Sequence, residues 1–146
     1  MIKKILVAFD NGSKSQKALE TAIEIAGNGV AEIFIATSVK MPDVVTNYVM
    51  SRDILNNLED ETKKYFQNIL DEASAKVKEK NIPVQTVILY DSPGEALVKF
   101  AGEENIDLIV MGAHNRGTVE RFLMGMGSVS NYVLNHAHCL VLIAKD

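Results

Sequence analysis

Short apolar runs alternate along the chain with longer segments whose apolar residues recur at helical spacing. The short runs are bounded by polar or turn-forming residues and predict five strands, at residues 5–9, 33–36, 84–90, 106–111 and 140–143. The first run is apolar at every position from Ile5 to Phe9, which is typical of a strand buried on both faces of a sheet. The periodic segments between the strands predict four helices.

Residues that favour helix starts and ends delimit these helices. We expect them at residues 13–26, at about 51–80, from 92 onward and at 127–135, with loops at 40–50 and 112–126. A capping box of Ser13 with Gln16 predicts the first start. Ser92 before Pro93 predicts the third, because proline suits the first helical position.

This β-α-β-α-β-α-β-α-β order predicts a single α/β domain over residues 1–146. The expected architecture is a doubly wound parallel five-stranded sheet, Rossmann-like, with helices on both faces and strand order 3-2-1-4-5. In such sheets ligands bind beyond the carboxyl ends of the strands, where the strand order reverses. The candidate segments are therefore residues 10–13, 37–40, 91–94 and 112–130.

Composition excludes several classes of function. Fifteen Lys and Arg against nineteen Asp and Glu give a net charge of −4, which disfavours nucleic-acid binding. A single cysteine excludes a disulfide framework and suits a reducing compartment. No apolar run is long enough to predict a membrane span, and the one after Met1 stops at Asp10, which is short for a signal peptide. We expect a cytoplasmic protein without a membrane partner.

Two familiar phosphate-binding loops are absent from this sequence. Residues 112–117 have the G-x-x-x-x-G spacing of a P-loop, but Thr118 stands where the P-loop lysine belongs. Asp10-Asn11-Gly12-Ser13 follows the first strand, where a dinucleotide-binding fold has G-x-G-x-x-G. What remains is Gly127-Ser128-Val129 at a helix start, where free N–H groups favour an anion. The alternative is that Gly127 and Ser128 only turn the chain and cap the helix.

In combination and order, several segments resemble the universal stress protein family over nearly the whole chain. They are residues 4–10 (KILVAFD), residues 107–114 (DLIVMGAH), and residues 127–130 (GSVS) followed by Val133, His136, Cys139 and residues 141–143. The ATP-binding branch of that family carries G-x-x-G, nine residues, then G-S or G-T.

The glycine motif departs from this pattern. Gly112 leads to Asn115 in place of the second glycine, and the Gly-Ser pair stands two positions later than the motif has it. Nine residues do separate Gly117 from Gly127, which indicates two extra residues in the loop. Asn is the mildest replacement for glycine, because it tolerates the left-handed conformation. ATP binding is therefore the favoured interpretation.

The resemblance implies a site assembled from four parts of the chain. Adenine and ribose would meet Ala8, Phe9 and Asp10, the base would lie against Ser38 or Val39, Met111 and Gly112 would floor the site, and Gly127, Ser128 and Val129 would hold phosphates. The implied cofactor is ATP, with Mg or Mn as an optional companion ion and AMP as an alternative. The resemblance also implies a homodimer paired through the last strand, Leu140–Ala144.

Other chemistry-bearing residues have simpler roles. Asp10 alternatively caps the first helix, and His114 and Arg116 fit a solvated loop. The spacing of His136, His138 and Cys139 is not a usual zinc pattern, and Cys139 is expected to be an inert core thiol.

Three functions stay open. The first is a regulatory, stress-response protein that binds ATP. The second is a member of the same family that binds no nucleotide and acts as a dimeric interaction module. The third and most distant is a phosphoacceptor receiver, because Asp10, Asp91 and Lys145 stand roughly where that class needs them, although Asn11 replaces its second acid. Without a nucleophile–base pair or a P-loop lysine, we expect binding with at most slow ATP hydrolysis.

Overall fold

The computed structural model describes residues 1–27, 30–39, 52–90, 92–113 and 128–145, and in residues 52–56 it describes the backbone alone. Its elements, in chain order, are β1 (Lys4–Ala8), α1 (Ser13–Ala26), β2 (Glu32–Val39), α3 (Arg52–Lys78), β3 (Val84–Tyr90), α4 (Pro93–Glu103), β4 (Leu108–Gly112), α6 (Ser128–His136) and β5 (Leu140–Ala144). The expected loop at residues 40–50 lies outside the described residues, as do residues 114–126 of the loop expected at 112–126, whereas Gly112 belongs to β4.

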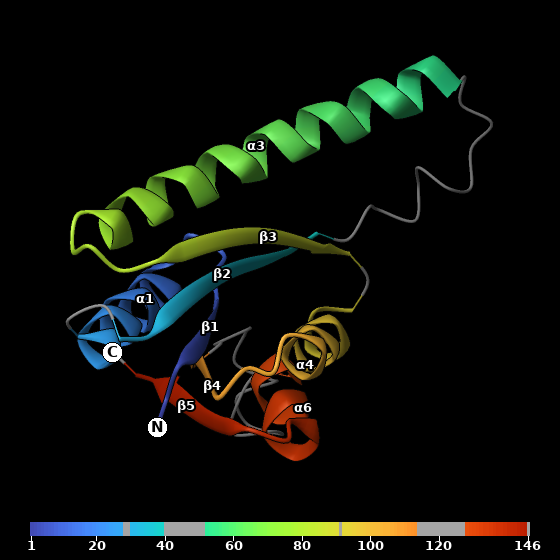
Figure 1. Ribbon diagram of the computed structural model, residues 1–146. Helices are drawn as coiled ribbons and strands as arrows, with labels where there is room; N and C mark the ends of the chain where they lie inside the picture. The colour runs from blue at the N-terminus through green and yellow to red at the C-terminus, as the bar shows by residue number, and fades with distance from the viewer. Residues whose placement is uncertain (28–29, 40–51, 91, 114–127, 146) are drawn as a thin grey trace.

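The strands form one parallel sheet in the order β3-β2-β1-β4-β5, which confirms the predicted topology (Figure 1). The register places Val7 of β1 beside Ile35 of β2 on one side and Val110 of β4 on the other. The carboxyl ends of β1, β2 and β4 therefore lie together, and the strand order reverses at β1. This is where the rule for open α/β sheets places a ligand.

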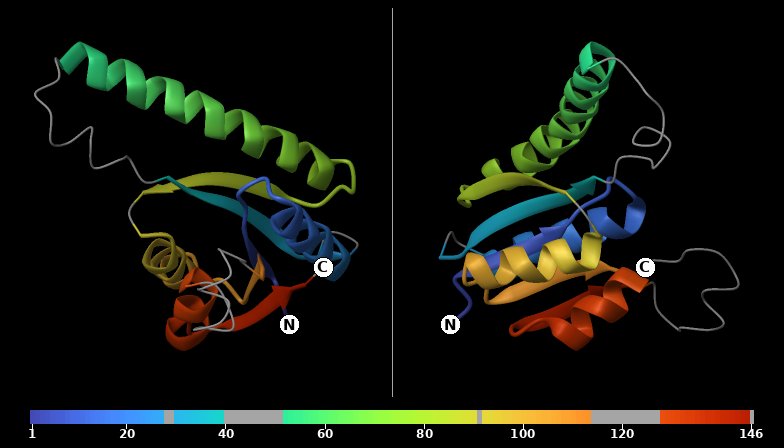
Figure 2. Two further views of the ribbon diagram at one scale, coloured as in Figure 1. Left: turned by 180° about the vertical axis from the view of Figure 1, so that it is seen from behind. Right: turned by 90° about the vertical axis from the view of Figure 1, so that its right-hand side faces the viewer.

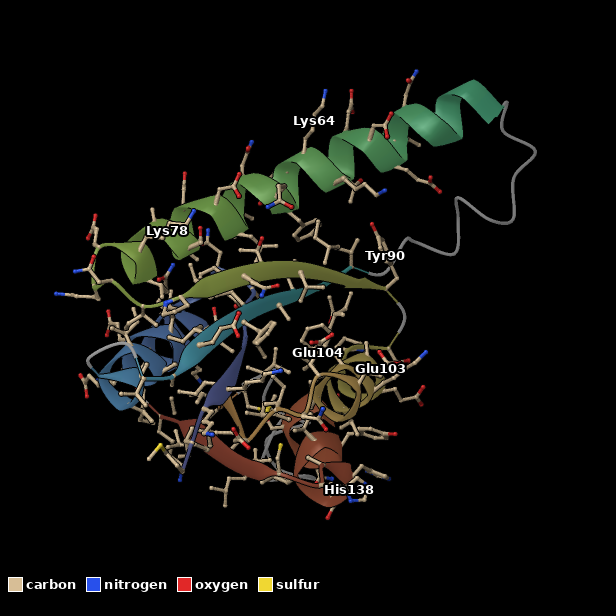
Figure 3. All side chains as sticks on the ribbon, in the orientation of Figure 1. Lys64, Lys78, Tyr90, Glu103, Glu104 and His138 are labelled. Atoms are coloured by element: carbon tan, nitrogen blue, oxygen red, sulfur yellow. The ribbon has the colours of Figure 1, made fainter. Side chains whose placement is uncertain are left out.

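Two hydrophobic clusters fill the two faces of the sheet. Ile5 and Val7 of β1 pack with apolar residues of α1 and α3, whereas Leu6 packs with those of α4 and α6. Successive side chains of a strand point to opposite faces, so the continuous apolar run in β1 feeds both clusters. Both views in Figure 2 show α4 and α6 side by side, and Lys64 of α3 points away from the sheet in Figure 3.

Several helix and strand ends differ from the sequence prediction. β2 runs from Glu32 to Val39, well beyond the predicted 33–36, so that Ser38 and Val39 belong to the strand and do not follow it. The prediction of a capping box formed by Ser13 and Gln16 is wrong. α1 begins at Ser13, so the N-cap residue is Gly12, which has no side chain to make a capping hydrogen bond. Gln16 Nε2 donates instead to Asn11 Oδ1 at 2.9 Å. β4 begins at Leu108 and not at Ile106, because the Ile106 N–H donates to Ala101 O and closes the end of α4.

Asp107 joins the start of β1 to the start of β4. Its Oδ2 accepts hydrogen bonds from the backbone N–H groups of Lys3 and Lys4, at 2.9 and 3.0 Å. These two hydrogen bonds stabilise the ionised carboxylate and hold the pKa of Asp107 below its usual value. Within the described part of the chain, no helix has the length and apolar character needed to cross a membrane.

Candidate functional site

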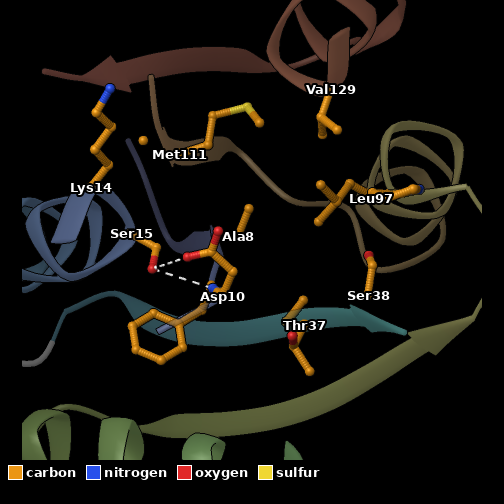
Figure 4. A pocket seen from close by; sticks show the side chains of 13 residues that line it. Ala8, Asp10, Lys14, Ser15, Thr37, Ser38, Leu97, Met111 and Val129 are labelled. Atoms are coloured by element: carbon orange, nitrogen blue, oxygen red, sulfur yellow. Dashed lines mark hydrogen bonds between the residues drawn. The ribbon is translucent and has the colours of Figure 1, made fainter. Parts of the chain in front are cut away.

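A pocket of about 150 Å³ opens at the carboxyl ends of β1, β2 and β4 (Figure 4). The described residues that line it are Ala8, Phe9, Asp10, Lys14, Ser15, Ala36, Thr37, Ser38, Pro93, Leu97, Met111, Gly112 and Val129. Seven of these are residues that the sequence placed at the site: Ala8, Phe9, Asp10, Ser38, Met111, Gly112 and Val129. The fold thus brings together segments that are more than a hundred positions apart.

The carboxylate of Asp10 holds the turn between β1 and α1. Its Oδ1 accepts hydrogen bonds from the Ser15 hydroxyl and from the Gly12 N–H, both at 2.8 Å. The Ser15 hydroxyl oxygen in turn lies 3.2 Å from the Asp10 N–H. Asn11, between them, has a φ of 66°, a conformation that asparagine tolerates better than most residues. Asp10 therefore helps to start α1 and at the same time lines the pocket.

The end of β2 contributes Ser38 but not Val39 to this pocket. Neighbouring side chains of a strand point to opposite faces. Ser38 faces the pocket, whereas Val39 lines a separate cavity of about 260 Å³ beside α3, with Ile88, Tyr90 and residues of that helix. Of the two residues that the sequence offered against the base, the structure thus brings only Ser38 to the site.

The floor of the pocket is a close contact between β4 and α1. Met111 is buried, and Gly112 lies against the first turn of α1. A Cβ added at Gly112 would come within 2.7 Å of the backbone and the Cβ of Lys14. Gly112 has no positive φ, so the position requires glycine for space and not for backbone conformation. The absence of this side chain lets Lys14 approach the strand end.

Three helices begin at the pocket. It is lined by Lys14 and Ser15 in the first turn of α1, by Pro93 at the start of α4 and by Val129 at the start of α6. Tyr132 of α6 packs against the position of Gly94, so the starts of α4 and α6 adjoin. Each helix start carries partial positive charge from unpaired N–H groups, which favours an anionic ligand.

Of the other residues that the sequence predicted to hold phosphates, the structure describes only Ser128. Ser128 is exposed at the start of α6 and does not line the pocket, and Asn115, Gly117 and Gly127 lie outside the described residues. Ser130, two residues on, is fully buried, and its hydroxyl has no hydrogen-bond partner within the described part of the chain. A buried hydroxyl of this kind is costly unless another group satisfies it.

Sequence reasoning missed Lys14, Ser15, Ala36 and Leu97 as pocket residues, whereas Thr37 and Pro93 lie in the candidate segments 37–40 and 91–94. Lys14 and Ser15 carried a usable signal, because polar residues in the first turn after a strand end face the ligand edge of such a sheet. Leu97 was assigned to the apolar face of its helix, and it does pack in the cluster beneath the sheet. Its second role, lining the pocket, depends on how α4 docks and has no sequence signal.

No metal centre is found in the part of the chain that the structure describes, where no three His, Cys, Asp or Glu residues come close enough to share an ion. Cys139 is half-buried beside the cluster under α4 and α6, and burial raises the pKa of its thiol. It does not line the pocket.

Known proteins share this sequence pattern and this fold. A family model described as the universal stress protein family matches residues 1–145. Universal stress protein YxiE of Bacillus subtilis is 31% identical over 150 residues, which cover 99% of this chain and all of YxiE. The structure of protein MJ0577 of Methanocaldococcus jannaschii has a TM-score of 0.84 at 23% identity, covering 100% of this chain and 97% of that one. A universal stress protein in complex with cAMP has a TM-score of 0.74 at 27% identity, covering 98% and 97%.

Proposed function

The chain belongs to the universal stress protein family, and from that premise we propose that it binds an adenine nucleotide, ATP, in the pocket at the ends of β1, β2 and β4. The observation that carries the proposal is the meeting of three helix starts at one pocket. Helix N-termini bind phosphate groups through free N–H groups and the helix dipole. The solved family member in complex with cAMP supports an adenine nucleotide as the ligand class.

The lining divides in a way that suits the two halves of a nucleotide. Ala8, Leu97 and Met111 offer apolar surface for a base, and Ser38 and Asp10 offer polar atoms for base and ribose. Phosphates would meet the start of α6. This assignment follows the general pattern of small-molecule sites, which combine apolar walls with a few placed polar groups.

A divalent ion fits this site only as a companion of the nucleotide. Asp10 is the single carboxylate among the described lining residues, and its Oδ1 already accepts two hydrogen bonds. Mg²⁺ is usually bound by one or two carboxylates together with substrate phosphates. Asp10 would therefore hold such an ion, while the ion itself would neutralise phosphate charge.

Binding, with at most slow hydrolysis, is the proposed activity. Asp10 is engaged in the turn, and no histidine lines the described part of the pocket. An activated attacking water needs a positioned base. A turnover on the order of 10 per second, a typical value for enzymes, would contradict this proposal.

Isothermal titration with ATP tests the proposal, using protein stripped of co-purified nucleotide. Val129→Glu places a carboxylate at the start of α6, where it suits the helix dipole but repels phosphate. Val129→Gln is the matched control of similar size without charge. We expect the unmodified protein to bind ATP saturably. Val129→Glu should weaken ATP affinity at least tenfold more than Val129→Gln, which is about the effect of one charged contact. Absence of saturable binding by the unmodified protein would overturn the nucleotide function.

A dimeric interaction module is the second candidate, and the exposed edge of β5 favours it. Among the described strands β5 pairs only with β4, and Leu140 is 62% exposed. An unpaired edge invites pairing with a second copy. We propose a homodimer through Leu140–Ala144. Light scattering of the unmodified protein should give twice the 16.0 kDa chain mass. Leu140→Lys should give the mass of one chain. Val30→Lys is the control, because it changes another exposed apolar residue and should leave the dimer intact.

A further inference from the structure

Lys14 is an unusual residue for its place in the fold. It is the second residue of α1, where the helix dipole disfavours a positive charge, and no acidic residue in that turn offsets it. Within the described part of the chain its ammonium group has no hydrogen bond or salt bridge. Residues that break a local rule of this kind are expected at functional sites.

The start of the Lys14 side chain is fixed in position. Gly112 at the end of β4 leaves no room for a Cβ, because Lys14 backbone atoms and its Cβ occupy that space at 2.7 Å. The Lys14 side chain therefore begins at the pocket floor, where the first turn of α1 packs directly on the end of β4. Among the described lining residues it is the single cation, opposite the single anion Asp10.

Lys14 and Val129 lie on either side of Met111, across the pocket from Thr37 and Ser38 (Figure 4). A nucleotide whose base lies at the end of β2 would thus direct its phosphates to the side that carries both the start of α6 and Lys14. A first phosphate would then meet the start of α6, and further phosphates would extend along the floor toward Lys14.

We infer that Lys14 pairs with the terminal phosphates of the bound nucleotide and makes the pocket prefer ATP to AMP, an inference that rests on the proposed function. Lysine suits this task because its ammonium group is a compact charge on a flexible stem, able to follow a phosphate chain. The preference is then set by a residue at the start of α1 and not by the glycine motif of the sequence.

The test compares nucleotide affinities of four proteins by isothermal titration: the unmodified protein, Lys14→Ala, Lys14→Arg and Lys17→Ala. Lys17 lies one turn further along α1, is exposed and does not line the pocket, so it is the matched control. Lys14→Ala should lower ATP affinity about tenfold, as expected for one charge-assisted hydrogen bond in a partly exposed site, and leave AMP affinity nearly unchanged. Lys14→Arg should keep the preference, and Lys17→Ala should match the unmodified protein.

Two results would overturn the inference. Equal losses for ATP and AMP in Lys14→Ala would mean that Lys14 acts on the shared part of the ligand or on the fold. No loss for either would mean that Lys14 does not reach the ligand. Failure of the unmodified protein to bind any nucleotide would instead refute the proposed function, so the two failures are distinct. Urea unfolding of each variant separates a lost contact from a lost fold.

Discussion

Gly112→Ala tests the close contact on which the pocket floor depends. The added methyl group would stand 2.7 Å from the carbonyl carbon, the carbonyl oxygen and the Cβ of Lys14. Two of these atoms are backbone, so no side-chain rotation relieves the overlap. The first turn of α1 and the end of β4 must separate.

The expected loss of stability follows from the size of that overlap. Carbon atoms pack best at about 3.5–4.0 Å, so the contact is short by roughly 1 Å. Overpacking of this kind costs about 1–3 kcal/mol. Replacing glycine by alanine where the backbone allows it returns about 0.4–1 kcal/mol by restricting the unfolded chain. The net loss is therefore about 0–2.6 kcal/mol, with a midpoint of about 1.3 kcal/mol, or a fall in Tm of up to about 10 °C for a chain of this size.

Urea unfolding, followed by circular dichroism, measures this loss, and Gly102→Ala is its matched control. Gly102 lies in α4 with nothing within 4 Å of its Cβ position, so alanine there should raise stability by about 0.5–1 kcal/mol through helix propensity alone. A Gly112→Ala protein stabilised as much as the Gly102→Ala protein would refute the close contact. Gly112→Ala should also weaken ATP binding, because Lys14 is displaced with its helix.

Three further predictions concern residues away from the floor. Gly94→Ala should destabilise the protein by about 1–3 kcal/mol in urea unfolding, because its Cβ would overlap Tyr132 at 2.9–3.0 Å and force α4 from α6. Because the pKa of Asp107 is lowered in the folded protein, its ionised carboxylate contributes stability above pH 3.8 that is lost as the pH falls through the lowered pKa. Asp107→Asn should therefore unfold at lower urea than the unmodified protein at neutral pH. In acid the stabilities of the two proteins should converge. Cys139, whose thiol pKa is raised by burial, should react with a disulfide reagent more slowly than free cysteine; an equal rate would contradict its packing.

The sheet topology was predictable because the hydrophobic pattern itself encodes it. β1 is apolar at every position since it lies between two neighbours and under helices on both faces. Element ends were less predictable. Ile106 is as apolar as a strand residue and is buried, yet its N–H closes α4, a bond that local sequence does not specify. Ser13 and Gln16 matched a capping box by spacing, but Asp10 and Ser15 organise that turn.

The candidate site was predictable where it depends on strand ends and not where it depends on how helices dock. Asp10, Ser38 and Met111 end strands of a parallel sheet, so topology alone brings them together. Lys14 and Leu97 enter the pocket through the packing of α1 on β4 and of α4 under the sheet. Besides its place after a strand end, Lys14 carried a second sequence signal, because it is a cation at a helix start with no acid in the same turn.

A chain with a net charge of −4 can bind an anionic ligand because most of its acidic residues lie outside the described pocket, whereas the groups that attract the ligand lie next to it. At physiological salt, exposed charges are screened beyond about 8 Å, so acidic residues on the far surface of α3 have little effect at the pocket. Three helix starts and Lys14 act within that distance, on a ligand in direct contact with them. Added salt should therefore weaken ATP binding mainly through the partly exposed Lys14. It follows that affinity should depend less on salt in Lys14→Ala than in Lys17→Ala, although both variants carry the same net charge.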